Sequence, residues 1–295
     1  MRACILFLTY DRFEYTKQSL QSIVDNTDRS QYDLLLWDNN STEEGMLDWL
    51  EEFCNKHNFH FIFYKENAGL TYAMNNQMKI MNLNYGPYDV FCHIANDVVV
   101  PQNWLNGIFT AINHEEVGLI GLNLEDNSKF PLQDFGDIKL EKLRPECNVG
   151  GMHFCIPKRV YDLIGGFKDV ICGYGQQDAN YSLIVKLLPN KWWIYYLDIN
   201  QYKGTHLGLL NFIPRNENND KDILYKEYHD KMVIRLKASG NDRNGGKLYR
   251  QYIEKVRYEF DKKKITYEQM VELLKIPENT FTRVHMTNIK KTNLK

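Results

Sequence analysis

The chain has 295 residues, of which 43% are hydrophobic, 13% aromatic and 25% charged. This is the composition of an ordinary globular protein, and it excludes disordered, collagen-like and coiled-coil proteins. The 36 lysine and arginine residues nearly balance the 38 aspartate and glutamate residues, giving a net charge of -2. A surface that coats nucleic acid is therefore not expected. The length suffices for one large α/β domain or about two average domains.

The hydropathy and cysteine patterns predict a cytoplasmic protein without a membrane span. The longest apolar run, near Ile5 to Leu8, is far too short to cross a bilayer, and no signal-peptide pattern opens the chain. Peripheral contact with the cytoplasmic face of a membrane is left open. The cysteines are widely spaced without a CxxC pair, so we expect reduced, mostly buried thiols and neither disulfides nor structural zinc. They are Cys4, Cys54, Cys92, Cys147, Cys155 and Cys172.

Short apolar runs alternate with amphipathic segments over residues 1–122. The run Ala3 to Leu8 is typical of a strand buried on both faces. The alternation predicts an α/β fold with a mainly parallel sheet and helices on both faces. The predicted strands are 3–8, 34–37, 59–64, 90–95 and 117–122. The predicted helices are 14–25, a segment carrying Met46 to Phe53 behind an N-cap at Ser41 or Thr42, 70–81 and 102–113.

The pattern loosens after residue 122. Residues 123–148 read as a loop-rich segment, followed by helices at 158–164 and 179–187 and a strand at 191–197. Residues 211–295 carry 19 basic and 12 acidic residues, a net charge of +7 against -9 for residues 1–210. This part shows helical patterns at 220–237, 247–263 and 266–275 and ends in a polar tail at 287–295. We therefore predict an α/β domain over 1–210 and a basic, mostly helical C-terminal extension over 211–295.

Four polar residues lie within three positions after the ends of predicted strands: Asp11, Asp38, Asn67 and Asp97. The carboxyl ends of parallel strands meet at one edge of a sheet, where ligands bind in such folds, so these side chains should converge. Asp38 suits a nucleoside base or ribose, and equally a turn cap. Asp97 could hold a hard divalent cation against two phosphates, although a lone acid also suits a simple Asx turn.

Two residues further along the chain are open to both a chemical and a structural reading. Asp178 follows a glycine-bearing segment and precedes a predicted helix, so it could be a general base or, as its local sequence favours, an N-cap. His206 could be a metal ligand, although its surroundings favour a plain loop histidine. The sequence contains no GxxxxGK[ST], GxSxG or HExxH motif, and no GxGxxG after the first strand.

Six segments occur in a characteristic order along the chain. They are ILFLTYDR (5–12), LLWDNNST (35–42), ENAGLTYAMN (66–75), IANDVVVPQNWL (94–105), the glycine pairs at 150–151 and 165–166, and GYGQQD (173–178). Each is weak alone, but their order and spacing resemble the GT-A glycosyltransferases of family 2. The likeness covers about residues 1–210.

This resemblance implies inverting transfer of a sugar from a nucleoside diphosphate sugar, commonly a UDP-sugar, to a hydroxyl of a glycan or glycoconjugate. It implies Mn²⁺ or Mg²⁺ on the diphosphate, held by Asp97 and His206, with Asp178 as the base that takes the acceptor proton. The implied nucleotide-binding residues are Thr9, Tyr10, Arg12, Asp38, Asn67, Gly69, Asn75 and Asn96. The residues implied to border the sugar and acceptor are Gly150, Gly151, Met152 and Gln177.

Two positions depart from the family's pattern. The first acid of its DxD element is Ala95 here, and the usual Glu-Asp pair near the base is Gln177-Asp178. One acid remains at each site, so the leading interpretation is an active, metal-dependent transferase. The alternative is a non-catalytic GT-A-like module that binds nucleotide sugar or glycan. A nucleotidyltransferase comes third, because the loop after the first strand lacks glycines. The sequence does not determine the sugar, the acceptor or the oligomeric state.

Overall fold

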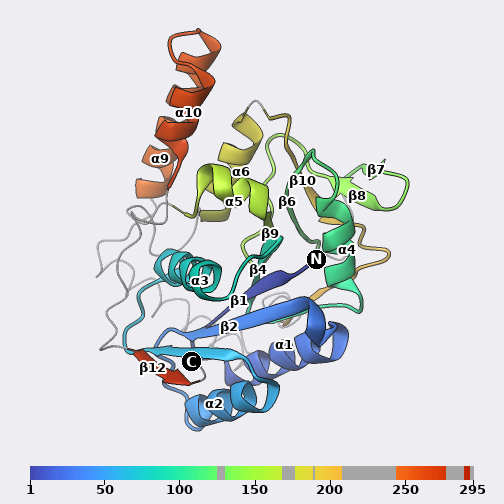
Figure 1. Cartoon of the computed structure of the whole chain (residues 1–295), viewed down its shortest axis with the longest axis vertical. Helices are drawn as coiled ribbons and strands as arrows, with labels where there is room; N and C mark the ends of the chain where they lie inside the picture. Colours follow the sequence, from blue (N-terminus) through green and yellow to red (C-terminus); the bar gives the residue numbers. More distant parts are fainter. Residues whose placement is uncertain (125–129, 168–176, 189, 208–243, 277–288, 293–295) are drawn as a thin grey trace, which may run out of the picture.

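The structure is a computed structural model of the chain, and it describes residues 1–124, 130–167, 177–188, 190–207, 244–276 and 289–292. Ten strands within these ranges form one mixed sheet. They are β1 (Ala3–Thr9), β2 (Tyr32–Asp38), β3 (His60–Tyr64), β4 (Val90–Ala95), β6 (Val117–Leu122), β7 (Leu132–Asp134), β8 (Lys139–Lys142), β9 (His153–Pro157), β10 (Trp193–Leu197) and β12 (Ile289–Thr292). Their order is β12-β3-β2-β1-β4-β9-β6-β10-β8-β7 (Figure 1). A separate ribbon pairs β5 (Val98–Val99) with β11 (Thr205–His206).

Most strands of the main sheet run in one direction. β3, β2, β1 and β4 are parallel neighbours, as are β6 and β10. Three of the ten described strands, β12, β9 and β8, run the other way. The predicted mainly parallel sheet is confirmed. The prediction misses β9, because its sequence HFCIP opens with a histidine and closes with a proline, which interrupt the apolar pattern.

Helices cover both faces of this sheet, as predicted (Figure 1). They are α1 (Phe13–Asn26), α2 (Met46–His57), α3 (Leu70–Asn84), α4 (Trp104–Ile112), α5 (Lys158–Ile164), α6 (Gln177–Leu187), α9 (Asn244–Asp261) and α10 (Tyr267–Leu274). The core on one face is shared by α1, α2 and α4, and the core on the other by α3, α5, α6, α9 and α10. Burial on both faces explains why the central strands are continuously apolar.

One local prediction is wrong. The N-cap expected at Ser41 or Thr42 is not formed, because α2 begins at Met46 behind Gly45, which has a left-handed backbone. The segment 123–148, predicted to be rich in loops, also contains β7 and β8, which form an antiparallel pair. Both strands are short and largely polar, which hides them from a search for apolar runs. The predicted burial of the cysteines holds for Cys4, Cys54, Cys92 and Cys155, while Cys172 lies outside the described residues.

The C-terminal extension packs on the α/β domain. The helices predicted at 247–263 and 266–275 are confirmed as α9, which contacts α6, and α10, which contacts α5. The helix predicted at 220–237 lies outside the described residues. Part of the predicted polar tail forms the edge strand β12 beside β3. The boundary placed at residue 210 stays a prediction. In the described ranges, no helix is long and apolar enough to cross a membrane.

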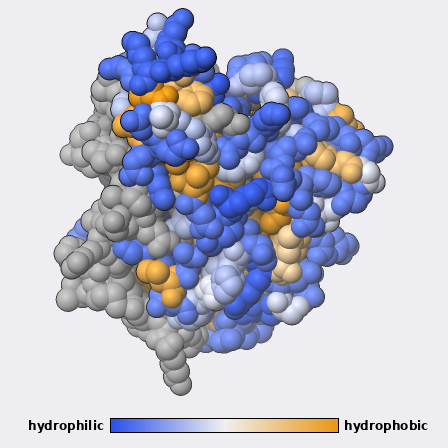
Figure 2. Space-filling view, turned by 45° about the horizontal axis from the view of Figure 1, so that its top comes forward, coloured by the Kyte–Doolittle hydropathy of each residue, from blue (hydrophilic) through white to orange (hydrophobic). Residues whose placement is uncertain are grey.

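The two helices of the extension form a hairpin that projects from the rest of the molecule (Figure 1). Its end is strongly hydrophilic on the face shown in Figure 2, where Lys262, Lys263 and Lys264 join α9 to α10. Exposed Tyr258 and Leu273 lie on its flanks. The hairpin is therefore polar at its end and apolar where it meets α5 and α6.

A glycine fixes the join between the extension and the domain. Gly165 follows α5 with φ of 74°, and a Cβ placed on it would lie 1.7 Å from the Ile276 carbonyl oxygen. The Ile276 N–H donates to the Ile164 carbonyl at 2.8 Å, and the Gly166 N–H donates to the Ile276 carbonyl at 3.2 Å. Only glycine permits both this backbone conformation and this close approach.

We predict that Gly165→Ala lowers the free energy of unfolding by at least about 2 kcal/mol, because it adds backbone strain and a collision with Ile276. Equilibrium urea unfolding measures the loss. The comparison variant is Gly45→Ala, since Gly45 also has a positive φ, 72°, in the ordinary left-handed region (ψ -5°, against -148° at Gly165), with no atom near its Cβ position. It should lose only about 1 kcal/mol. Equal losses in the two variants would show that neither the collision with Ile276 nor the rarer backbone conformation of Gly165 adds a cost.

Candidate active site

The loops after β1 and β2 are joined at the carboxyl edge of the sheet. The Asp11 backbone N–H donates to Ser41 Oγ at 2.8 Å, and the Thr42 N–H donates to the Asp11 carboxylate at 2.7 Å. The Asn39 N–H donates to the Thr9 carbonyl at 2.9 Å. These contacts bring the ends of the two strands to one place, as the parallel topology leads us to expect.

Glu43 caps α1 from the loop after β2. Its carboxylate accepts the backbone N–H groups of Arg12 at 2.7 Å and Phe13 at 2.8 Å, which places a negative charge at the positive end of the helix. Asp11 and Arg12 both have left-handed backbones, with φ of 53° and 61°. Two such residues in succession are uncommon outside glycine. The sequence analysis misses this role because Glu43 lies 30 positions from the helix it caps.

Two basic side chains meet one oxygen of Asp97, which is only 4% exposed in the turn after β4. Arg12 Nη1 lies 2.5 Å and His206 Nε2 3.2 Å from Asp97 Oδ2. Pairing of β11 with β5 sets His206 opposite Val98, which explains how distant positions of the chain meet. Burial alone would raise the pKa of Asp97, but His206 and Arg12 outweigh it and hold that pKa below its ordinary value.

Asn96, Thr9 and Thr16 form a polar cluster behind this group. Asn96 Nδ2 donates to the Asp11 carbonyl and to Thr16 Oγ1, both at 3.0 Å, and Thr9 Oγ1 lies 3.3 Å from Thr16 Oγ1. The cluster ties the loop after β1 to the end of β4. The nucleotide contacts expected of Thr9 and Asn96 stay predictions, and the structure gives both side chains a role within the protein.

Asp38 is fully buried at the end of β2. Its oxygens accept the Ser41 backbone N–H at 2.8 Å and Ser41 Oγ at 2.5 Å, so the turn cap is formed. Burial raises the pKa of Asp38 to about 6, although these hydrogen bonds act to lower it. Contact with a nucleoside base stays a prediction for this residue.

Asn39 organises the neighbouring loop, which carries two of the predicted nucleotide-binding residues. Its Nδ2 donates to Asn67 Oδ1 at 3.1 Å and to the Gly69 carbonyl at 3.4 Å, and its Oδ1 accepts the Ala68 N–H at 3.3 Å. Asn67 and Gly69 are thereby held beside the end of β2. The sequence analysis does not single out Asn39, and its place directly after Asp38 at a strand end is the signal that could have done so.

Asp178 lies in the first turn of α6, which already includes Gln177, so the N-cap reading is wrong. A Cβ placed on Gly151 would lie 3.3 Å from Asp178 Oδ2. Burial raises the pKa of Asp178, and hydrogen bonds from the backbones of Ala179 and Gly151 offset only part of the rise. A raised pKa makes a carboxylate a stronger proton acceptor.

The segment Gly150 to Met152 contacts both Asp178 and the end of β4, the strand that leads to Asp97. The Met152 carbonyl accepts the Ala95 N–H at 2.8 Å, at the end of the strand that leads to Asp97. Gly151 contacts Asp178, and the Gly150 N–H donates to Tyr196 Oη at 2.9 Å. The segment thus touches the end of β4 on one side and the start of α6 on the other.

Three further predicted site residues are Asn75, Tyr10 and Gln177. Asn75 uses its whole side-chain amide on Phe167, donating to its carbonyl at 2.7 Å and accepting its N–H at 2.8 Å. Tyr10 is half-buried in the loop after β1, and Gln177 is buried in α6. Their contacts with a donor or acceptor stay predictions.

The donor set fits a weakly held divalent cation. No group of three His, Cys, Asp or Glu side chains arranged to hold a metal occurs in the described part of the chain, and Ala95 stands where a second acid would. Asp97 and His206 offer one carboxylate oxygen and one imidazole nitrogen, which suit Mn²⁺. The pair fits a cation that takes its remaining ligands from a diphosphate and water, once Arg12 leaves Asp97.

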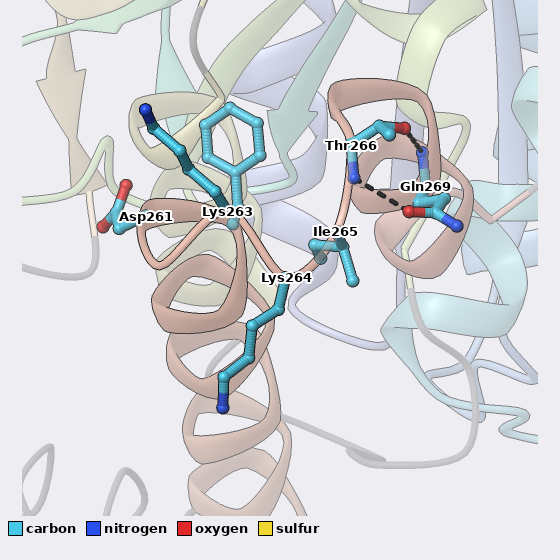
Figure 3. A pocket seen from close by; sticks show the side chains of 7 residues that line it. Asp261, Lys263, Lys264, Ile265, Thr266 and Gln269 are labelled. Atoms are coloured by element: carbon cyan, nitrogen blue, oxygen red, sulfur yellow. Dashed lines mark hydrogen bonds between the residues drawn. The ribbon is translucent and has the colours of Figure 1, made fainter.

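A surface hollow lies elsewhere, at the turn between α9 and α10 (Figure 3). It is lined by Phe260, Asp261, Lys263, Lys264, Ile265, Thr266 and Gln269. Thr266 Oγ1 accepts the Gln269 N–H at 3.2 Å and Gln269 Oε1 accepts the Thr266 N–H at 2.8 Å, which caps α10. No predicted site residue borders this hollow, so it belongs to the extension.

The sheet, its two helical layers and the acid-bearing turn after β4 define a GT-A glycosyltransferase fold. The structure of GalNAc-T7 with UDP, GalNAc and Mn²⁺ matches with a TM-score of 0.54 and 13% identity, over 70% of this chain and 44% of that one. S. aureus TarS 1–349 in complex with UDP-GlcNAc matches with a TM-score of 0.51 and 15% identity, over 70% and 61%. At such identities the likeness shows the fold. The chain spans less than two thirds of the length of either structure.

Residues 4–159 match the family described as glycosyl transferase family 2. Because the match takes in more than half of the chain, the protein belongs to this family. The matched residues include the strand ends from Thr9 to Asp97 and the segment Gly150 to Met152, but not Asp178 or His206. No curated protein is similar enough in sequence to count as a relative.

Asp38 predicts a pH dependence of stability. Its folded-state pKa of about 6 lies above the ordinary value of 3.8, so the folded state binds more protons between these pH values and stability falls as pH rises through them. Relative to Asp38→Asn, the wild-type free energy of unfolding should fall by about 2 kcal/mol from pH 4 to pH 7. Urea unfolding at each pH measures the difference.

The control for this experiment is Asp28→Asn. Asp28 is exposed, and hydrogen bonds from Ser30 lower its pKa. Its contribution to stability is therefore lost as the pH falls, the opposite of Asp38, and the change lies at a lower pH. If the free energies of unfolding of wild type and Asp38→Asn differ by the same amount at every pH, then the pKa of Asp38 is not raised in the folded state.

Proposed function

We propose that the protein is an inverting glycosyltransferase that moves a sugar from a nucleoside diphosphate sugar, UDP-sugars first, to a hydroxyl of a glycan or glycoconjugate. One observation carries the proposal: the segment Gly150 to Met152 contacts half-buried Asp178 on one side and, on the other, the end of β4 that leads to buried Asp97. Inversion needs the base and the groups that bind the diphosphate on opposite sides of the anomeric carbon, hence on different segments. The UDP and UDP-GlcNAc in the similar structures support starting with uridine nucleotides.

In this proposal Asp178 is the general base. It takes the proton of the acceptor hydroxyl as that oxygen attacks the anomeric carbon, and the bond to the diphosphate breaks with its electron pair leaving on the diphosphate. The contact with Gly151 orients the carboxylate, and burial supports proton acceptance by raising its pKa.

The donor would lie along the strand ends. Asp97 and His206 would hold Mn²⁺ or Mg²⁺, which when bound offsets the charge that the diphosphate gains as it departs. Arg12 adds a fixed positive charge on the same side. The loops around Asp38 and Asn67 would enclose the nucleoside, and the glycines at 150 and 151 leave room for the sugar. A cytoplasmic setting belongs to the proposal and is supported by the buried free thiols.

The donor nucleotide is identified first, by thermal unfolding with UDP, GDP, CDP, ADP or dTDP, each with and without Mn²⁺. A ligand at a hundred times its dissociation constant adds about 2.7 kcal/mol, which such a measurement resolves. UDP-sugar hydrolysis then reports turnover before the acceptor is known. Nucleotide binding without turnover would instead favour the non-catalytic module, for which the replacement of two family acids by Ala95 and Gln177 argues.

We predict that Asp178→Asn lowers sugar transfer or donor hydrolysis about a thousandfold, because the variant lacks a proton acceptor. Calorimetry should find its affinity for UDP unchanged. The control is Asp162→Asn, which alters an exposed acid of α5 that pairs with Lys158 and should keep full turnover. Turnover retained by Asp178→Asn would remove the base assignment, whereas loss of UDP binding as well would point to damage to the fold.

The two glycines offer a matched pair of variants. In Gly151→Ala the new methyl group would lie 3.3 Å from Asp178 Oδ2 and displace it, so we predict about a tenfold lower turnover. In Gly150→Ala the nearest atom to the methyl group is Tyr196 Oη at 3.6 Å, an ordinary contact, so turnover should fall less. Initial rates at saturating donor compare them. A larger loss in Gly150→Ala would mean that the sugar, and not the base, is the crowded partner.

A further inference from the structure

The oxygen that a divalent cation would use is already bonded by a cation of the chain. Arg12 Nη1 lies 2.5 Å from Asp97 Oδ2, the same oxygen that His206 approaches at 3.2 Å. Asp97 is buried, whereas the Arg12 side chain remains about a quarter exposed, at 24%. Of these two paired side chains, Arg12 is therefore the more accessible to a metal ion or a donor that arrives from solvent.

The local charge also opposes a metal ion. With Ala95 in place of an acid, Asp97 is the carboxylate available at this position, and Arg12 neutralises it. A divalent cation at Asp97 Oδ2 would meet a carboxylate already paired with a guanidinium and would lie within a few ångströms of that like charge, which repels it. A diphosphate changes this balance, because it can accept the guanidinium and ligate the metal together.

The Arg12 backbone is held in place, whereas its guanidinium can pair with either of two anions, the Asp97 carboxylate or the diphosphate of a donor. Glu43 holds the Arg12 N–H at 2.7 Å, and Asn96 holds the carbonyl of the preceding Asp11 at 3.0 Å. Asp11 and Arg12 both have left-handed backbones, a form of strain that concentrates at functional sites. A planar guanidinium pairs with a carboxylate or a phosphate equally well. The side chain can thus change partner without moving the loop.

We propose that Arg12 is an internal competitor of the metal ion. It occupies Asp97 Oδ2 in the free protein and transfers to the diphosphate of the donor, so that the cation binds together with the nucleotide and not before it. This inference rests on the proposed function for its ligand, a nucleoside diphosphate. It does not depend on sugar transfer.

The first test measures Mn²⁺ binding to the full chain without nucleotide, by electron paramagnetic resonance of the free ion. Arg12→Gln should bind Mn²⁺ at least about tenfold more tightly than wild type, because a repelling charge is gone and Asp97 is released. Adding Asp97→Asn to this variant should abolish the gain, which locates the ion. The control is Lys17→Gln, which removes a cation of α1 that pairs with Glu14 and should change nothing.

The second test measures UDP binding in EDTA by calorimetry. Arg12→Gln should bind UDP at least about tenfold more weakly, since the metal-free diphosphate then loses its guanidinium partner. The two expected changes have opposite signs, whereas a loosened or misfolded variant would weaken both ligands. Mn²⁺ affinity that is unchanged or weaker in Arg12→Gln, or metal-free UDP affinity that does not fall, overturns the proposal. If wild type binds no nucleotide, the proposed function fails, and the Mn²⁺ measurement still decides whether Arg12 excludes the ion.

Discussion

A single buried charge governs the carboxyl edge of the sheet. An ionised carboxylate as deeply placed as Asp97 is stable only when other groups of the protein pair with it. The chain supplies those groups from two distant segments, Arg12 in the loop after β1 and His206 in β11. The short ribbon of β5 and β11 places one of these groups, because the pairing of its two strands positions the His206 imidazole beside Asp97. The same pairing brings a carboxylate, a guanidinium and an imidazole together at one point of the sheet edge.

Neutral amides fix the loops around that charge. Gln77 in α3 donates to the backbone carbonyls of Phe7 and Leu35, at 3.0 and 2.8 Å, and so ties the helix to β1 and β2. Asn39 and Asn96 fasten the loops after β2 and β1 in the same manner. Amides can do this without adding charge to a site that would bind an anionic donor. The electrostatic potential at this edge therefore depends on a few ionised groups, so a substitution of one of them has an effect that is easier to interpret.

The sequence predicts those strands and helices whose formation is determined by residues close together in the chain. The strands β1, β2, β4 and β6 are buried on both faces, so their apolar runs are visible in a short window of sequence. Their carboxyl ends then place Asp38 and Asp97 at one edge by topology alone. The resemblance to a family adds Asp178 and the glycines at 150 and 151, whose roles depend on comparison with other chains.

What the sequence does not predict depends on contacts between distant positions. β12 pairs with β3, and polar residues of a chain tail give no sign of that. Glu43 looks like part of its own loop but caps α1. Arg12 is predicted as a nucleotide-binding residue, and its bond with Asp97 emerges only when the loop after β1 takes its left-handed turn. Each case needs the fold first, since no local pattern encodes the partner.

The docking of the C-terminal hairpin determines where this chain can be shortened. Ile253 and Val256 of α9 and Met270 of α10 are buried in the same core as α5 and α6, and Arg257 donates to the Leu187 carbonyl at the end of α6. A protein cut at residue 210 would present the apolar sides of α5 and α6 to water as one contiguous patch, the kind of surface that drives aggregation. The hairpin thus covers the apolar sides of α5 and α6, and we expect the solubility of the α/β part on its own to depend on that cover.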